Sequence, residues 1–243
     1  MYLYAFNMYA GFDKVFILNE KKSDLKEGDI IQNNEWFFFL VLWENISFPE
    51  VYNILYTSDT NFTKTYKWLI SQETMKLIHW MVYERYTSYK NVMKFFIDSE
   101  IEKLLSKEIK PNKKTKNYDI KIWKHEIKWD WKEQSLIVFP DIRSYHNIIW
   151  TENKQWIFLY SLDTQSIKNS NRWKIKTGNE PLIFATSSEI FQDFKNLKNI
   201  YLIEPQKRYY ASQQDPRYKV WSVLEKIAEN YDAKITIINS EDL

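Results

Sequence analysis

The feature that most constrains the fold is a pair of short apolar runs in the last third of the chain, Leu182–Phe184 and Ile200–Ile203. Each run is followed by a polar loop. Short uninterrupted apolar runs are typical of strands that are buried in a parallel sheet. The segment between them, residues 191–197, is predicted to be a helix or a turn. Loops at the carboxyl ends of such strands bind ligands, so these loops are the first candidates for a site.

Three further segments fit the same sheet. Ser135–Ile142 and Trp156–Tyr160 precede the two runs, and Ala233–Ile238 follows them. Residues 118–243 are therefore predicted to form a parallel-sheet α/β domain.

The first 47 residues are predicted to form a small β-rich domain. Strands are expected at Tyr2–Tyr4, Lys14–Leu18 and Glu35–Trp43, and Leu25–Ile31 is expected to be a tight turn at Gly28 that leads into a further strand. Residues 48–105 are expected to be helical.

Ser71 is the predicted N-cap of one helix in that region. The apolar positions expected to face its core are Met75, Ile78, Met81 and Val82. His79 is interpreted as a packed histidine rather than a ligand. Residues 106–117 lie in a lysine-rich stretch and are predicted to be a basic linker.

Composition sets the remaining limits. The 243 residues are 44% hydrophobic, enough for one large domain or two to three small ones, and the net charge is only +2. Without cysteine there is no disulfide, thiolate zinc site or thiol nucleophile. No apolar run approaches the ~18 residues of a membrane span, and no secretory signal is recognisable, so we expect a cytoplasmic protein without a membrane partner.

Glycine is scarce, with only Gly11, Gly28 and Gly178 in the chain. A phosphate-cradling Walker A loop needs glycines, and none lies between residues 29 and 177. The carboxylates Asp141 and Glu189 have no evident partner in the sequence. These observations predict a protein that is not an enzyme and holds neither a cofactor nor a metal.

Residues 181–218 resemble the first helicase lobe of the primosomal protein N′ family of bacterial replication-restart helicases. The matching positions are Thr186, Ser188, Phe191, Phe194, Asn196, Leu197, Tyr210, Gln213, Pro216, Arg217 and Tyr218. The family's acidic Asp-Glu-Glu-His motif is replaced by residues 203–206, Ile-Glu-Pro-Gln. Lys124 takes the approximate place of the Walker A lysine. The resemblance therefore implies a degenerate nucleotide site at Lys124 and Glu204 that does not hydrolyse ATP.

The resemblance extends to the rest of the chain. Residues 1–47 are similar to the family's domain that captures a DNA 3′ end, with Phe12 and Asp13 at the terminal sugar. The alternative for Asp13 is an ordinary turn residue. Residues 69–86 are similar to the start of the family's winged-helix module, and no second helicase lobe or cysteine-rich zinc insertion is expected. The implied fold class is thus α+β and α/β multidomain: a small β-rich domain (1–47), a winged-helix-like module (48–105), a linker (106–117) and a helicase-lobe-like α/β domain (118–243).

Tyrosines beside cations can stack bases, and lysines can neutralise phosphates. The predicted DNA-binding residues are Phe12, Asp13, Arg85, Lys90, Lys94, Lys113, Lys114, Arg143, Thr186, Ser187, Ser188, Lys207, Arg208, Tyr209, Tyr210, Gln213, Arg217 and Tyr218. The alternatives are a solvated helix face for the charges and a structural ion pair for Arg217.

The expected function is a non-catalytic DNA-binding protein of replication restart or repair, related to the primosome. Its DNA partner would be forked, single-stranded or 3′-ended. The alternative is an interaction scaffold for replisome or repair proteins. Salt separates the two, because phosphate binding weakens steeply as the salt concentration rises.

Overall fold

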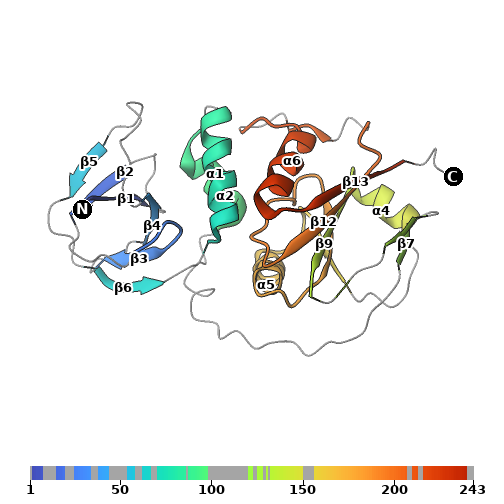
Figure 1. The fold of residues 1–243 in the computed structure, drawn as a ribbon, viewed down its shortest axis with the longest axis horizontal. Helices are drawn as coiled ribbons and strands as arrows, with labels where there is room; N and C mark the ends of the chain where they lie inside the picture. The colour runs from blue at the N-terminus through green and yellow to red at the C-terminus, as the bar shows by residue number, and fades with distance from the viewer. Residues whose placement is uncertain are drawn as a thin grey trace. The chain divides into compact units, whose positions relative to one another are not determined.

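A computed structural model describes residues 2–7, 15–19, 25–33, 38–43, 54–57, 62–66, 70–85, 87–97, 120–122, 125–127, 130, 132–149, 156–206, 210–212 and 216–239. The chain divides into two compact units, Met1–Lys94 and Phe95–Leu243 (Figure 1). The finer division into four segments stays a prediction.

The first unit contains a six-stranded sheet in the order β5-β2-β1-β4-β3-β6. Its strands are β1 (Tyr2–Asn7), β2 (Val15–Asn19), β3 (Ile30–Asn33), β4 (Phe38–Trp43), β5 (Ile54–Thr57) and β6 (Phe62–Tyr66). The four strands predicted within residues 1–47 are present. The sheet continues beyond them, because β5 pairs with β2 in parallel and β6 pairs with β3 in antiparallel fashion.

The helical expectation for residues 48–105 was therefore wrong at β5 and β6. Four of the five residues of Phe62–Tyr66 are aromatic or threonine, a composition that favours a strand over a helix. The expected helices begin later, as α1 (Gln72–Glu84) and α2 (Tyr89–Phe96). The division between the two units falls near the end of α2.

The predicted start of α1 is confirmed. The Ser71 side chain caps the helix by accepting a hydrogen bond from the Thr74 backbone N–H at 3.2 Å. The four apolar positions expected to face the core are all buried. His79 is packed as expected, with its two ring nitrogens 2.6 Å from a Glu27 carboxylate oxygen and 2.7 Å from the Tyr89 hydroxyl.

The turn before β3 depends on Gly28. Its φ of 86° lies in the left-handed region, and an added Cβ would sit 2.5 Å from the Ile70 carbonyl oxygen. The Asp29 side chain closes the same turn by accepting a hydrogen bond from the Lys26 N–H at 2.8 Å. A side chain at position 28 would thus be strained and would collide with the segment that leads into α1.

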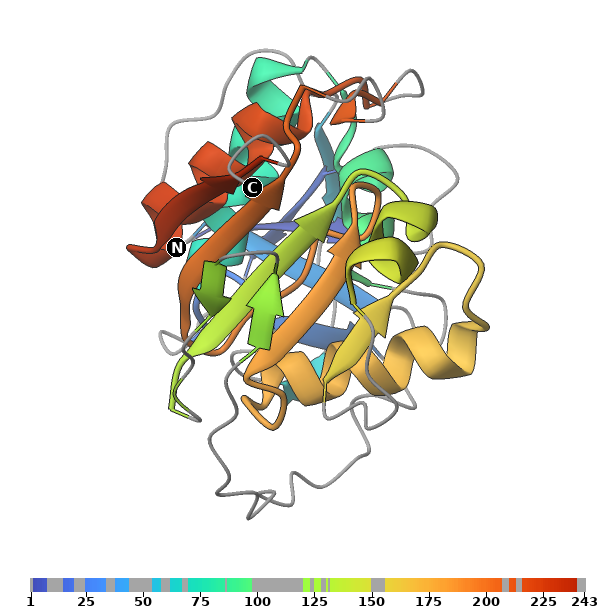
Figure 2. The ribbon, with the colours of Figure 1, turned by 90° about the vertical axis from the view of Figure 1, so that its right-hand side faces the viewer.

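The second unit contains a five-stranded sheet in the order β10-β11-β9-β12-β13, with every neighbouring pair parallel (Figure 2). Its strands are β9 (Gln134–Phe139), β10 (Ile157–Leu159), β11 (Leu182–Thr186), β12 (Leu197–Ile203) and β13 (Lys234–Ile238). All five lie where the apolar runs predicted them. The parallel-sheet α/β expectation is confirmed, and the short strands β7 (Ile120–Ile122) and β8 (His125–Ile127) form a separate two-stranded sheet.

Helices and the small sheet cover the two faces. One face packs Ile137 and Phe139 of β9 against Tyr145 of α4 (Ile142–Ile148) and against β7 and β8. The helices α5 (Gln165–Lys176) and α6 (Val220–Tyr231) connect strands in the opposite direction along the sheet from α4. Because such crossovers are right-handed, α5 and α6 cover the other face.

The connection between β11 and β12, predicted to be a helix or a turn, contains no helix. Phe191 and Phe194 are buried instead, each 2% exposed. The backbone N–H groups of Lys195 and Asn196 both donate to the side-chain oxygen of Gln134. A side chain far away in sequence therefore replaces the carbonyl acceptors that a helix would supply.

No helix in the described part of the chain is long and apolar enough to cross a membrane.

Candidate nucleic-acid interface

The carboxyl ends of β9 and β11 lie next to each other, since Thr186 pairs with Phe139 in the register of the two strands. Arg143 lies in the first turn of α4, which begins shortly after β9, and Ser187 and Ser188 lie in the loop after β11. We call these three residues the polar ledge. Arg143 and Ser188 are exposed and Ser187 is half-buried. Two segments that the sequence analysis assigned separately to DNA contact are thus neighbours at one sheet edge.

Two residues hold the segments that carry the polar ledge. Asp141 is the N-cap of α4 and accepts a hydrogen bond from the Ser144 N–H at 2.8 Å. Thr186 is only 6% exposed, and its hydroxyl lies 3.4 Å from that of Ser188. Thr186 was predicted to contact DNA, but its burial leaves it better placed to hold Ser188 than to meet a ligand itself.

Tyr210 occupies the point where the strand order reverses direction. The connection after β9 leads towards β10 and the one after β12 leads towards β13, and ligands of open parallel sheets bind at such a point. The Tyr210 hydroxyl lies 3.0 Å from the Val138 carbonyl oxygen and 2.5 Å from that of Ile203. The ring is 7% exposed, and burial raises the pKa of Tyr210.

Tyr218 is equally buried, at 7% exposed. Its ring packs edge-on against Phe191, with centroids 5.0 Å apart, and against Phe95. Burial, followed by the negative charge of Glu189, raises the pKa of Tyr218 to about 12. In this arrangement neither Tyr210 nor Tyr218 offers a ring face to a base, so the predicted stacking role conflicts with their burial. Arg217, between Pro216 and Tyr218, is exposed.

Glu204 follows β12 in a left-handed conformation with φ of 48°. Its N–H donates to the Ile238 carbonyl oxygen at 2.8 Å, which holds the end of β12 against β13. Among the described residues, no group of three or more His, Cys, Asp or Glu side chains is placed to hold a metal ion.

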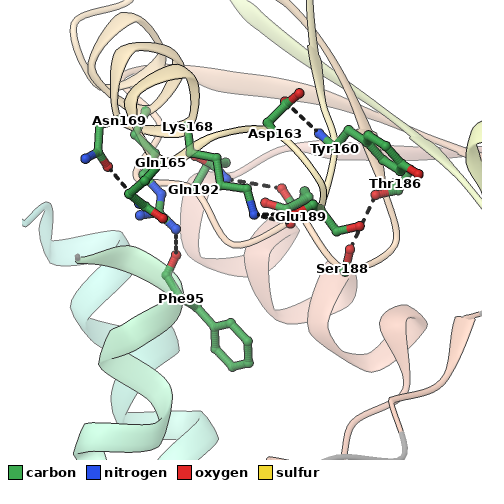
Figure 3. A network of polar contacts seen from close by, with 12 residues as sticks. Phe95, Tyr160, Asp163, Gln165, Lys168, Asn169, Thr186, Ser188, Glu189 and Gln192 are labelled. Carbon is green, nitrogen blue, oxygen red and sulfur yellow. Dashed lines mark hydrogen bonds and ion pairs between the residues drawn. The ribbon is translucent and has the colours of Figure 1, made fainter. Parts of the chain in front are cut away.

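A network that the sequence analysis missed lies beside the ledge (Figure 3). The Lys168 ammonium on α5 is 3.5 Å from the Glu189 carboxylate, although the sequence showed no partner for that residue. Desolvation raises the pKa of Glu189, and the charges of Lys168 and Arg172 only partly oppose this effect. Lys168 and Glu189 are 21 residues apart, so no local sequence pattern predicts their contact. The contact becomes evident only once β10 is known to pair with β11.

The first unit carries three further predicted DNA-binding residues. The Arg85 guanidinium lies over the Trp80 ring, 5.4 Å from its centroid. Lys90 and Lys94 are exposed one turn apart on α2. These positions are compatible both with phosphate contact and with a solvated helix face.

The remaining predicted residues lie outside the described part of the chain, so their roles stay predictions. They are Phe12, Asp13, Lys113, Lys114, Lys207, Arg208, Tyr209 and Gln213 for DNA, and Lys124 for the degenerate nucleotide site.

A comparison with models of known protein families finds no match to this chain, and a comparison with curated proteins finds none either.

Proposed function

We propose that this protein binds DNA without hydrolysing ATP, as a factor of replication restart or repair that resembles the primosomal protein N′ family. The observation that carries the proposal is the parallel pairing of β9 with β11, which brings the start of α4, with Arg143, and the Ser187–Ser188 segment to the same edge of the sheet. The binding of forked and 3′-ended DNA is part of the proposal and rests on the resemblance of residues 1–47.

The ledge has the chemistry of a backbone contact. An arginine forms charge-assisted hydrogen bonds to phosphate oxygens, and serine hydroxyls donate to the same oxygens. Such contacts position a strand without reading its sequence. Because Tyr210 and Tyr218 are packed, the described part of this edge supplies polar contacts rather than base stacking.

Fluorescence anisotropy with labelled oligo(dT) and a labelled fork tests the proposal. Wild type should bind both, and Arg143→Ala should weaken binding and lower the slope of log affinity against log salt by about one, the change expected for one lost phosphate contact. Lys195→Ala is the matched control, since it removes one exposed positive charge just before β12, at the opposite edge of the sheet. Unchanged binding by Arg143→Ala would contradict the role of the ledge.

The two remaining parts have separate assays. A fork with a 3′-OH should bind more tightly than the same fork with a 3′-phosphate, and Asp13→Ala should remove the difference, because a carboxylate accepts from the hydroxyl and repels the phosphate. DNA-stimulated ATP hydrolysis by purified protein would overturn the non-catalytic part.

A protein-interaction scaffold is the second candidate. Leu162 in the loop after β10 is 78% exposed, and Ile167 in the first turn of α5 is 48% exposed. Exposed apolar side chains of this size suit a protein interface. Absence of DNA binding at low salt, together with a partner complex that persists at high salt, would favour this candidate.

A further inference from the structure

The pair formed by Lys168 and Glu189 is partly withdrawn from solvent. The side chains are 21% and 14% exposed, and they meet where the loop after β11 passes α5. Strand β10 pairs in parallel with β11, with Leu159 opposite Ala185. The loop after β10 therefore begins at the same edge of the sheet as the loop after β11. Figure 3 shows the Lys168 side chain reaching Glu189, which lies in the loop after β11 and follows Thr186 and Ser188.

Lys168 is held in place independently of Glu189. Its ammonium donates to the Ser161 carbonyl oxygen at 2.7 Å, which ties it to the loop after β10. The α5 helix also begins at this edge, with no acidic residue in its first turn, so the positive end of its dipole lies on the same side. The ammonium would remain at the edge if the carboxylate moved away.

Glu189 is a poor partner for this lysine. The separation of 3.5 Å exceeds the 2.7–2.9 Å of a strong charge-assisted hydrogen bond. The Arg172 guanidinium, the next cation along α5, donates to the Phe95 carbonyl oxygen at 2.9 Å and is therefore already engaged. The pKa of Glu189 is raised because burial destabilises the charged carboxylate more than the charges of Lys168 and Arg172 stabilise it.

We propose that Lys168 is a phosphate-binding cation of the ledge and that Glu189 is an internal anion that a DNA phosphate displaces from it. The inference rests on the proposed function. It adds Lys168 to the DNA-binding residues and a competition between Glu189 and a DNA phosphate for that lysine. A phosphate has several oxygens for the ammonium and for the neighbouring Ser188 hydroxyl, whereas the carboxylate of Glu189 reaches the ammonium only at a long distance. Glu189 therefore lowers the affinity for DNA.

The test uses the full chain and a fluorescein-labelled oligo(dT) at low salt. Glu189→Gln keeps the shape and removes the competing charge, so binding should tighten about fivefold or more, within the usual range for coupled binding events. Lys168→Met should weaken binding about tenfold.

The matched controls are Asp193→Asn and Lys176→Met. This second ion pair joins the last turn of the same helix to the same connection between β11 and β12. It has the same charges, and Lys176 lies at the far end of α5 from Lys168. Both controls should change the affinity by less than twofold, and thermal melting should show that every variant is folded.

The pH dependence gives a second readout. The charged and titratable groups that act on Glu189 are Lys168, Arg172 and Asp163, and Tyr218 faces it from the loop before α6. Protonation of Glu189 removes the competitor, so the affinity of wild type should approach that of Glu189→Gln as the pH falls. The ratio of the two affinities isolates this effect, because other groups contribute equally to both proteins.

The outcomes separate the two ideas. If wild type binds oligo(dT) but Glu189→Gln binds no more tightly, the competition is refuted and the proposed function stands. If Asp193→Asn tightens binding as much as Glu189→Gln does, net charge explains the effect and the inference also fails. If neither wild type nor Glu189→Gln binds at low salt, the proposed function fails.

Discussion

Gln134, at the start of β9, makes the clearest stability prediction. The residue is 2% exposed. Its amide nitrogen donates to the carbonyl oxygens of Ile175 at 2.8 Å and Glu180 at 3.1 Å. Its amide oxygen accepts from the N–H groups of Lys195 at 2.7 Å and Asn196 at 3.0 Å. The side chain thus uses its full hydrogen-bonding capacity to join three segments of the second unit.

Gln134→Met should lower the free energy of unfolding by about 1–3 kcal/mol. Methionine keeps the length of the side chain but leaves four backbone groups without this partner, at about 1–3 kcal/mol for each group that stays buried and unpaired. The Ile175 oxygen keeps the Gly178 N–H at 3.0 Å, and Lys195 and Asn196 are exposed residues whose N–H groups water can reach. The full penalty therefore falls mainly on Glu180, which is 8% exposed.

Urea denaturation followed by circular dichroism measures this loss. The matched control is Gln165→Met on α5, where an exposed glutamine makes one side-chain hydrogen bond, to Asn169 at 3.2 Å. The control should change the unfolding free energy by less than about 0.5 kcal/mol. A loss below about 1 kcal/mol in Gln134→Met would refute the argument that this amide organises the amino edge of the sheet.

Three further changes follow from single contacts. Gly28→Ala should cost about 2 kcal/mol or more, because the left-handed backbone and the Ile70 carbonyl both oppose a Cβ; thermal melting should show a smaller loss for Gly178→Ala, whose Cβ would meet only a flexible lysine side chain at 3.3 Å. Tyr210→Phe should lower the free energy of unfolding by about 1–2 kcal/mol in urea denaturation, since the single hydroxyl proton that two buried carbonyl oxygens share is lost. Burial raises the pKa of Glu189, so its contribution to stability is present below the unfolded pKa of about 4.3 and is lost as the pH rises through the folded pKa. Glu189→Gln should therefore gain stability relative to wild type as the pH rises above the unfolded pKa of about 4.3, and a difference that stays constant with pH would contradict this sign.

The sequence predicted the parallel sheet well because its signal is local. All six residues of β9 and all five of β11 are buried, and the apolar residues of each strand are consecutive, so no alternation suggests a half-exposed strand. The Ser71 cap and the Gly28 turn were likewise predictable, since each depends on residues within a few positions. Strand β6 was missed because its five residues are stabilised by pairing with β3, which is far away in the sequence.

The candidate site was predicted less well, because its contacts are long-range. The order of strands in the sheet decides which loops meet, and nothing in the sequence of β9 shows that β11 rather than β10 lies beside it. The pairing of Lys168 with Glu189 depends on the same order. The motif in residues 181–218 locates the loops along the chain, but it does not show which of their side chains are buried in the core.

The burial of Tyr210 and Tyr218 changes what the loop after β12 is expected to bind. A tyrosine near arginines suggests a base-stacking platform, yet Tyr210 gives its hydroxyl to two strand carbonyls and Tyr218 gives its ring to Phe191. If the protein binds DNA as proposed and these rings do not contact bases, the described residues of this edge would contribute phosphate contacts, which depend strongly on salt and weakly on sequence. Recognition by the described ledge should then discriminate little between bases. Any preference for a fork or a 3′ end must come from elsewhere in the chain, which is why the comparison of 3′-OH with 3′-phosphate and the oligo(dT) titration test different parts of the same protein.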